Sequence, residues 1–403
     1  MLPQPDTILG RWISDSRKDV GLYIKDTTEL AAFCDRARAS GLVALDTEFM
    51  REKTYFAKLC LIQACAAEES VIIDPLALRD LTPLLALLAD TSVLKVVHAG
   101  SQDMEIFYRL ANVAIAPIFD TQIAATLAGF PSQVGYARLV KEIYDVDIDK
   151  SDTFTDWARR PLTPAQIQYA LADVTYLPGM YETLRGRLEK DGRLQWVERD
   201  FERMSDPATY EVVPEQQFRR IKRASALSRR QLGVLQQVTA WRELEAQRRD
   251  LPKRWIVSDE TLVEVARRQP VDATALSDIR GMSPRALGDG GSGLLAAVCA
   301  GLALTDEQLP KIPKRPRNII DIEGIVELMS ALVRVRAVES GVAVPLLASR
   351  GDLERLAGGE REENPLLGGW RRTLIGEELV ALIDGRLALR VADGKVVVEA
   401  AQE

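Results

Sequence analysis

Residues 42–49 read LVALDTEF, an apolar run that becomes polar at its end. A short apolar run of this kind predicts a buried strand. Because side chains alternate along a strand, Asp46 and Glu48 face the same side, and both carboxylates belong to one site. The alternative is a strand end that reaches water, where acidic side chains are harmless.

The flanking sequence predicts an α/β arrangement around this strand. A helix is expected before it, capped by Asp26 or Thr27 and ended at Gly41. Further strands are expected at residues 58–65, 70–74 and 93–98. The first two of these are close enough to form a hairpin, and later strands are joined through helices, so we expect a mixed sheet.

Two more segments carry acidic residues in ordered positions. Asp103 lies in HAGSQDMEIF, residues 98–107, at the start of a predicted helix. There an acid also interacts favourably with the helix dipole, which is the alternative explanation for Asp103. Tyr169 and Asp173, in YALAD, are four residues apart on a helix that begins at Thr163-Pro164, so they share one face. The alternative for this pair is a surface tyrosine beside a solvated acid.

Taken together, these residues predict a metal centre. Four gathered carboxylates repel one another unless cations neutralise them, and oxygen-rich clusters suit Mg²⁺ or Mn²⁺. Two such ions are the known arrangement for displacement at a phosphate. The predicted ligands are Asp46, Glu48, Asp103 and Asp173, and the Tyr169 hydroxyl is predicted to orient the attacking water.

Composition excludes several classes of protein and of functional site. The chain has 403 residues and a formal net charge of −7, with a pI near 5.2, which excludes a globally basic nucleic-acid coat protein. His98 is the one histidine, so multi-histidine zinc sites are excluded. The four cysteines form no CxxC pair and no disulfide framework. No apolar run is long enough to cross a membrane and no secretory signal is visible, so we expect a soluble, cytoplasmic protein.

Positive charge is concentrated after the α/β region. Residues 219–254 hold 11 Lys or Arg against Glu243, Glu245 and Asp250, and Lys311–Arg317 adds four more cations. Such a stripe predicts phosphate contacts, and the alternative is a solvated helix face. The candidate cations are Arg219, Arg220, Lys222, Arg223, Arg248, Arg249, Lys253 and Arg254. Phe49, Met50 and Tyr55 are candidates for stacking on terminal bases, with core packing as the alternative.

Four stretches carry a resemblance to a known family: DTEFMREKTYFAKLCLIQ (46–63), VVHAGSQDMEIF (96–107), FDTQIAATLAGF (119–130) and residues 149–177, which include YALADVTYL. They resemble the exonuclease motifs of the ribonuclease D family, in the tyrosine subtype of the DEDD superfamily of 3′-to-5′ exonucleases. The resemblance implies a ribonuclease H-like fold, with Asp46, Glu48, Asp103 and Asp173 as metal ligands and Tyr169 as the water-positioning tyrosine.

Residues 232–270 resemble the HRDC domain, a small helical module, and the tail resembles the more divergent third domain of the same family. We therefore expect an exonuclease domain at 1–208, an HRDC domain at 215–303, a basic proline-rich linker at 304–318, and a second, divergent HRDC-like domain at 319–403. The sequence at the extreme C-terminus alternates as in strands and has a possible hairpin turn at Asp393-Gly394, so this part of the tail is not expected to be helical.

The resulting hypothesis is a metal-dependent exoribonuclease that uses two divalent ions, Mg²⁺ or Mn²⁺, and releases nucleoside 5′-monophosphates from RNA 3′ ends. The resemblance implies tRNA precursors as the substrate, and no obligate protein partner is evident. Two alternatives stay open: a DNA 3′-to-5′ exonuclease with the same carboxylates, and a non-catalytic RNA-binding scaffold.

Overall fold

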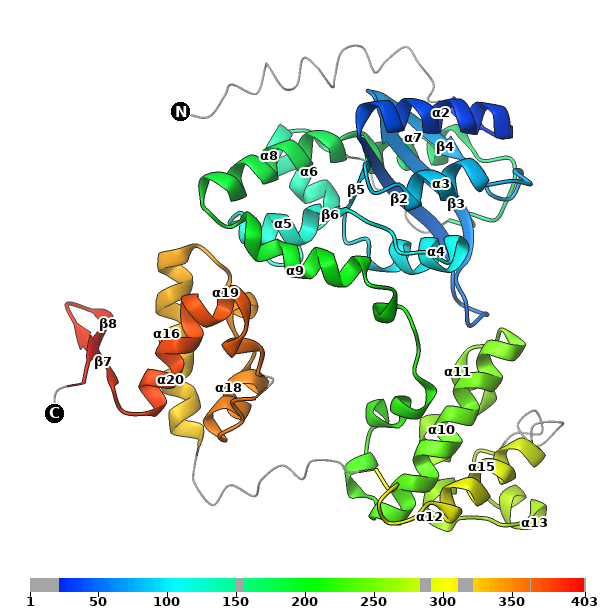
Figure 1. Ribbon diagram of the computed structural model, residues 1–403, viewed down its shortest axis with the longest axis vertical. Helices are drawn as coiled ribbons and strands as arrows, with labels where there is room; N and C mark the ends of the chain where they lie inside the picture. Colours follow the sequence, from blue (N-terminus) through cyan, green and yellow to red (C-terminus); the bar gives the residue numbers. More distant parts are fainter. Residues whose placement is uncertain (1–21, 149–154, 283–290, 311–321, 363, 402–403) are drawn as a thin grey trace. The chain divides into compact units, whose positions relative to one another are not determined.

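The computed structural model describes residues 22–148, 155–282, 291–310, 322–362 and 364–401 (Figure 1). The chain divides into two compact units. The first comprises Met1–Glu48, Cys60–Thr209 and Pro316–Glu403, and the second comprises Phe49–Leu59 and Tyr210–Arg315. Among the described residues, each unit has its own apolar core.

A six-stranded sheet in the order β1-β4-β3-β2-β5-β6 forms the centre of the first unit. β3 and β4 are antiparallel, whereas β1–β4, β2–β5 and β5–β6 are parallel, so the predicted mixed sheet is confirmed. The strands are β1 (Leu22–Ile24), β2 (Leu42–Met50), β3 (Lys58–Ala66), β4 (Glu69–Ile73), β5 (Leu94–Val97) and β6 (Ile118–Asp120). β1 and β6 were not predicted, because three residues are too few to show a hydrophobic pattern.

Of the helices of this unit, the first begins and ends where local signals predict. Asp26 caps the first of them by accepting from the Thr28 amide at 2.8 Å, and Gly41, at φ 72°, ends it in the left-handed region. The helices are α2 (Thr27–Ser40), α3 (Thr82–Ala89), α4 (Ser101–Ala111), α5 (Thr121–Leu127), α6 (Tyr136–Tyr144), α7 (Pro164–Thr175), α8 (Leu177–Lys190) and α9 (Leu194–Ser205).

The C-terminal part of the first unit is helical and ends in a two-stranded hairpin. The antiparallel strands β7 (Leu387–Ala392) and β8 (Lys395–Ala400) are joined at Asp393 and Gly394, both with positive φ, as expected for the predicted turn. The helices are α16 (Glu323–Ser340), α17 (Val344–Leu347), α18 (Arg350–Ala357), α19 (Gly369–Arg371) and α20 (Glu377–Ile383), with short turns η4 (Pro365–Leu367) and η5 (Arg372–Gly376).

This C-terminal part shares an apolar core with the sheet-containing part of the first unit, and the predicted separate domain at 319–403 remains a prediction. Buried residues of α16 belong to the same apolar cluster as Leu184 of α8 and Val197 of α9. The Trp196 and Trp370 rings stack at 5.2 Å, and the Arg193 guanidinium donates to the Ser340 carbonyl oxygen. Apolar side chains of both parts cover one another, and for this reason they form one compact unit.

The second unit contains the helices predicted between residues 215 and 303. They are η2 (Pro214–Arg220), η3 (Ala224–Ala226), α10 (Arg229–Arg249), α11 (Lys253–Ile256), α12 (Asp259–Arg268), α13 (Ala273–Ser277) and α15 (Gly291–Ala303). The unit also includes Phe49–Leu59, which the sequence did not indicate. Most of the predicted linker at 304–318 lies outside the described residues, and the four domain boundaries remain predictions. Within the described part of the chain, no helix is long and apolar enough to span a membrane.

Candidate active site

Three of the four predicted acidic ligands meet at the end of β2. Asp46 and Glu48 lie two residues apart on this strand, and Asp173 lies on α7. One carboxylate oxygen from each residue lies within 4.8 Å of the others. The strand alternation inferred from LVALDTEF therefore places both β2 acids at one site, and α7 supplies the third.

Burial and mutual repulsion make this cluster unfavourable as three free anions. Burial, followed by the charges of Asp173 and Asp103, raises the pKa of Glu48 to about 8. The pKa of Asp46 is raised well above its usual value by burial and then by Asp103, Asp173 and Glu48. Since carboxylates prefer hard cations, this donor set fits a divalent metal such as Mg²⁺ or Mn²⁺.

Asp103 is adjacent to the cluster but is not among the three grouped residues. It lies in the first turn of α4, is only 7% exposed, and accepts a hydrogen bond from the Thr47 hydroxyl. Burial raises the pKa of Asp103 to about 6, and the Thr47 hydrogen bond opposes this shift. The role of Asp103 as a fourth ligand therefore remains a prediction. Its charge contributes to the raised pKa values of Asp46 and Glu48.

The turn that carries Asp103 is held by Asp120. The Asp120 carboxylate caps α5 through the Gln122 amide at 2.8 Å and also accepts from the Ala99 and Gly100 amides at 3.1 and 2.9 Å. A Cβ on Gly100 would lie 2.5 Å from a Val97 methyl group, so the turn between β5 and α4 requires glycine.

Tyr169 lies on the same helix as Asp173, one turn before it. The helix begins with a capping box in which the Thr163 hydroxyl accepts from the Gln166 amide and the Gln166 side chain accepts from the Thr163 amide. The Tyr169 ring lies 6.0 Å from the ring of Trp157, which is buried. Packing against Trp157 limits the directions that the Tyr169 ring can take.

A second tyrosine, Tyr136 on α6, was missed by the sequence analysis. Its hydroxyl donates to the Ala172 carbonyl oxygen at 2.7 Å and accepts from the Tyr176 amide at 3.4 Å. These groups lie at the junction of α7 and α8, directly beside Asp173. Burial, followed by the charge of Asp173, raises the pKa of Tyr136 far above its usual value, so the hydroxyl stays neutral. A single tyrosine in a helical pattern carries no sequence signal for this position.

The segment before α7 is anchored to the sheet by Arg160. Its guanidinium forms a double ion pair with Asp74, at 2.7 and 2.8 Å, and donates to the Cys60 carbonyl oxygen at 2.7 Å. The Tyr23 hydroxyl donates to the same Asp74 carboxylate at 2.6 Å. The approach to α7 is thereby fixed against β1, β3 and the end of β4.

The predicted base-stacking residues separate in the structure. Tyr55 is 8% exposed, lies in the core of the second unit, and donates its hydroxyl to Glu243 of α10. Its backbone amide also donates to Asp250 at 3.0 Å. This burial favours the core-packing alternative for Tyr55, because a buried ring offers no face to a base, and the stacking role of Tyr55 remains a prediction. Phe49 and Met50 end β2, half-buried and exposed respectively, and their stacking role remains a prediction.

The predicted phosphate-binding cations all belong to the second unit and differ in their partners. Arg248 and Arg249 pair with Glu245, and Lys253 pairs with Glu243. Arg219, Arg220, Lys222, Arg223 and Arg254 are exposed. RNA binding by these eight cations remains a prediction.

Two family models match the chain. The 3′-5′ exonuclease model matches residues 22–189, which contain all five predicted catalytic residues. The HRDC domain model matches residues 231–298, from α10 to α15. The tail matches neither of these models, and a second HRDC-like domain stays a prediction.

Similar proteins cover nearly the whole chain. Ribonuclease D of Granulibacter bethesdensis is 44% identical over 95% of this chain and 98% of its own, and that of Gluconacetobacter diazotrophicus is 45% identical over 93% and 96%. The crystal structure of Escherichia coli RNase D, described as an exoribonuclease involved in structured RNA processing, matches with a TM-score of 0.80 and 34% identity, covering 90% of this chain and 98% of that one. With the carboxylate cluster at the end of β2, these matches show that the chain belongs to the ribonuclease D family.

Proposed function

We propose that this 3′-5′ exoribonuclease trims single-stranded 3′ trailers of tRNA precursors and releases nucleoside 5′-monophosphates with two divalent ions. The observation that carries the proposal is the grouping of Asp46, Glu48 and Asp173 within 4.8 Å, with burial and repulsion opposing the ionisation of Asp46 and Glu48. A site of this kind is completed by cations, and the E. coli relative is described as acting in structured RNA processing.

Each predicted catalytic residue has a separate role in this proposal. Asp46, Glu48 and Asp173 would hold the ions, joined by Asp103 from α4. When bound, divalent ions supply Lewis-acid chemistry at the phosphodiester. Tyr169, one helical turn before Asp173, would orient the attacking water through its hydroxyl, and Trp157 keeps its ring in place.

The proposal is tested by incubating the purified chain with tRNA precursors that carry different 3′ trailers, with Mg²⁺ or Mn²⁺, and sequencing the ends. We expect stepwise shortening that a chelator abolishes. Asp46→Asn should lower the rate by ~10²-fold or more, because changing residues that only support metal ligands already costs about 10- to 100-fold. Glu68→Gln, in the exposed β3–β4 turn, is the matched control and should leave trimming unchanged.

The same assay separates the alternatives. Faster trimming of a matched DNA strand would favour the DNA exonuclease. Trimming that survives Asp46→Asn or chelation would contradict the metal mechanism, and a chain that binds these RNAs but shortens none would be the non-catalytic scaffold. A cytoplasmic location also remains a prediction.

A further inference from the structure

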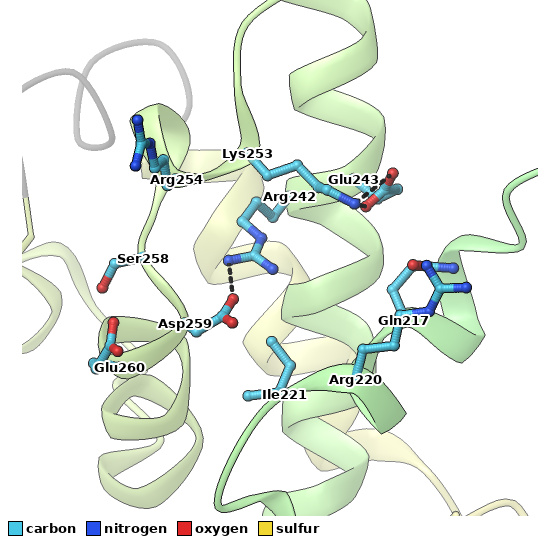
Figure 2. A pocket seen from close by; sticks show the side chains of 10 residues that line it. All are labelled: Gln217, Arg220, Ile221, Arg242, Glu243, Lys253, Arg254, Ser258, Asp259 and Glu260. Carbon is cyan, nitrogen blue, oxygen red and sulfur yellow. Dashed lines mark hydrogen bonds and ion pairs between the residues drawn. The ribbon is translucent and has the colours of Figure 1, made fainter. Parts of the chain in front are cut away.

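A pocket of about 420 Å³ lies within the second unit, between η2, α10, α11 and the first turn of α12 (Figure 2). This volume is in the range of pockets that hold small ligands. Four cationic side chains line it: Arg220, Arg242, Lys253 and Arg254. They come from three different elements, so the tertiary fold assembles this group.

The pocket has a polar floor built from two consecutive residues of α10. Arg242 is only 6% exposed and donates from Nη1 to the Val257 carbonyl oxygen at 2.9 Å and to Asp259 at 2.7 Å. Its Nε is buried with no hydrogen-bond partner. Buried donors are nearly always paired, so the guanidinium is a positive charge whose hydrogen bonding is incomplete.

The acidic residues around the pocket are largely neutralised. Glu243, fully buried, has Lys253 Nζ at 3.1 Å from its Oε2 and accepts from the Tyr55 hydroxyl. Asp259 pairs with Arg242, and Figure 2 shows both ion pairs. Glu260 is the one lining carboxylate for which no ion pair is found among the described residues.

Two of the arginines that line the pocket are available to bind a ligand. Arg220 and Arg254 are exposed, and neither forms an ion pair with a carboxylate in the described part of the chain. By contrast, Arg248 and Arg249 lie at the end of α10, pair with Glu245 at 2.7 and 3.6 Å, and do not line the pocket. Of the four cations that line the pocket, Arg242 and Lys253 are paired with carboxylates, and Arg220 and Arg254 form no ion pair in the described part of the chain.

We propose that this pocket binds the phosphate backbone of RNA, with Arg220 and Arg254, which lie on opposite sides of the pocket (Figure 2), each contacting one phosphate group. Planar guanidinium groups match the geometry of phosphate oxygens and form paired, charge-assisted hydrogen bonds. The proposal rests on the proposed function, because RNA is the substrate there, and it assigns the phosphate contact to one place in the helical unit. A free 5′-mononucleotide offers the same phosphate chemistry, so the test includes it.

The test measures binding of a fluorescent single-stranded RNA to the full chain in chelator, which prevents trimming, at several salt concentrations. We expect Arg220→Ala/Arg254→Ala to weaken binding by roughly 10-fold or more and to reduce the slope of log K against log salt by about 1.4, the value for two lost contacts to a single strand. Arg248→Ala/Arg249→Ala removes the same number of charges and should change the affinity by less than about 3-fold, because these arginines are already paired.

Two further measurements keep the outcomes distinct. Arg220→Lys/Arg254→Lys preserves the charge and should retain most of the salt slope while losing paired hydrogen bonds, which excludes misfolding as the cause. Unchanged RNA affinity in the alanine variant, or an equal loss in the Arg248→Ala/Arg249→Ala control, overturns the proposal. It is also overturned when 5′-AMP binding, but not RNA binding, depends on Arg220 and Arg254. Trimming of a very short oligonucleotide by the wild-type chain reports separately on the proposed function.

Discussion

Glu48 of β2 and Asp173 of α7 approach each other within 4.8 Å although they lie in distant parts of the sequence. The Asp173 charge is the largest contribution after burial to the raised pKa of Glu48. This relationship makes the site unfavourable for folding when it is empty of cations, and it makes the site a strong attractor for them.

Mg²⁺ is therefore expected to stabilise the folded chain. Saturation at 100 times the dissociation constant should add about 2.7 kcal/mol to the free energy of unfolding. Glu48→Gln removes one ligand charge, so Mg²⁺ should add much less to the free energy of unfolding of this variant. In chelator, by contrast, the variant should unfold at a higher temperature than the wild type. Thermal unfolding with Mg²⁺ and with chelator measures both effects. An equal Mg²⁺ shift in wild type and Glu48→Gln contradicts the assignment of Glu48, and Glu68→Gln controls for general charge effects.

The Asp74–Arg160 ion pair should make stability depend on acid pH. Although burial raises the pKa of Asp74, the hydrogen bonds from Arg160 and Tyr23 outweigh it and leave the pKa below its usual value of 3.8. A depressed pKa in the folded state contributes stability that is present above pH ~4 and is lost as the pH falls through the folded-state pKa. The free-energy difference between wild type and Asp74→Asn, measured by urea unfolding, should therefore shrink below about pH 4.

At neutral pH, breaking the same pair is expected to be costly. Asp74 is 2% exposed, so Arg160→Ala leaves a buried carboxylate without its main partner and should lower the free energy of unfolding by about 2–3 kcal/mol. Arg159→Ala, at the exposed neighbouring position, should change it by less than ~0.5 kcal/mol. Similar losses in both variants would show that Arg160 has no special role.

The Tyr136 hydroxyl should matter for catalysis because it holds the helix junction beside Asp173. Tyr136→Phe leaves the Ala172 carbonyl without this partner and should lower the free energy of unfolding by about 1–2 kcal/mol. We expect kcat to fall by roughly 10-fold with little change in KM, since a shift of a reacting group by 1 Å costs on the order of 10²-fold. Tyr181→Phe removes an exposed hydroxyl on α8 that accepts from Arg185 and should leave kcat unchanged. A larger change in KM than in kcat would contradict this role.

The burial of Tyr55 leads to an expectation for RNA binding. Tyr55→Phe keeps the ring and removes the hydrogen bond to buried Glu243, so it should lower the free energy of unfolding by about 1–3 kcal/mol. The affinity for single-stranded RNA should stay within ~2-fold of wild type, far less than the effect of losing base stacking. Urea unfolding and fluorescence anisotropy measure these two quantities. A loss of RNA affinity without a loss of stability would support a direct role for the Tyr55 side chain.

Local patterns predicted the main elements because their signals lie within a few residues. The β2 strand, the Asp26 cap, the helix start at Thr163 and the Asp393-Gly394 turn all follow from chemistry between near neighbours. Strand periodicity likewise placed Asp46 and Glu48 on one face, whereas their meeting with Asp173 is a contact of the tertiary structure. Family resemblance added the activity, which periodicity alone does not give.

Long-range relationships were decided by the tertiary structure. Nothing near Tyr55 in the sequence indicates Glu243, nothing near Thr47 indicates Asp103, and the tail's apolar residues carry no mark of the helices α8 and α9 that they join. Burial and charge pairing depend on which surfaces cover one another, and a residue's neighbours along the chain do not specify its neighbours in space. The amino-acid pattern thus determined which residues can do chemistry, whereas packing decided which of them lie together, which are buried, and which keep an unpaired charge.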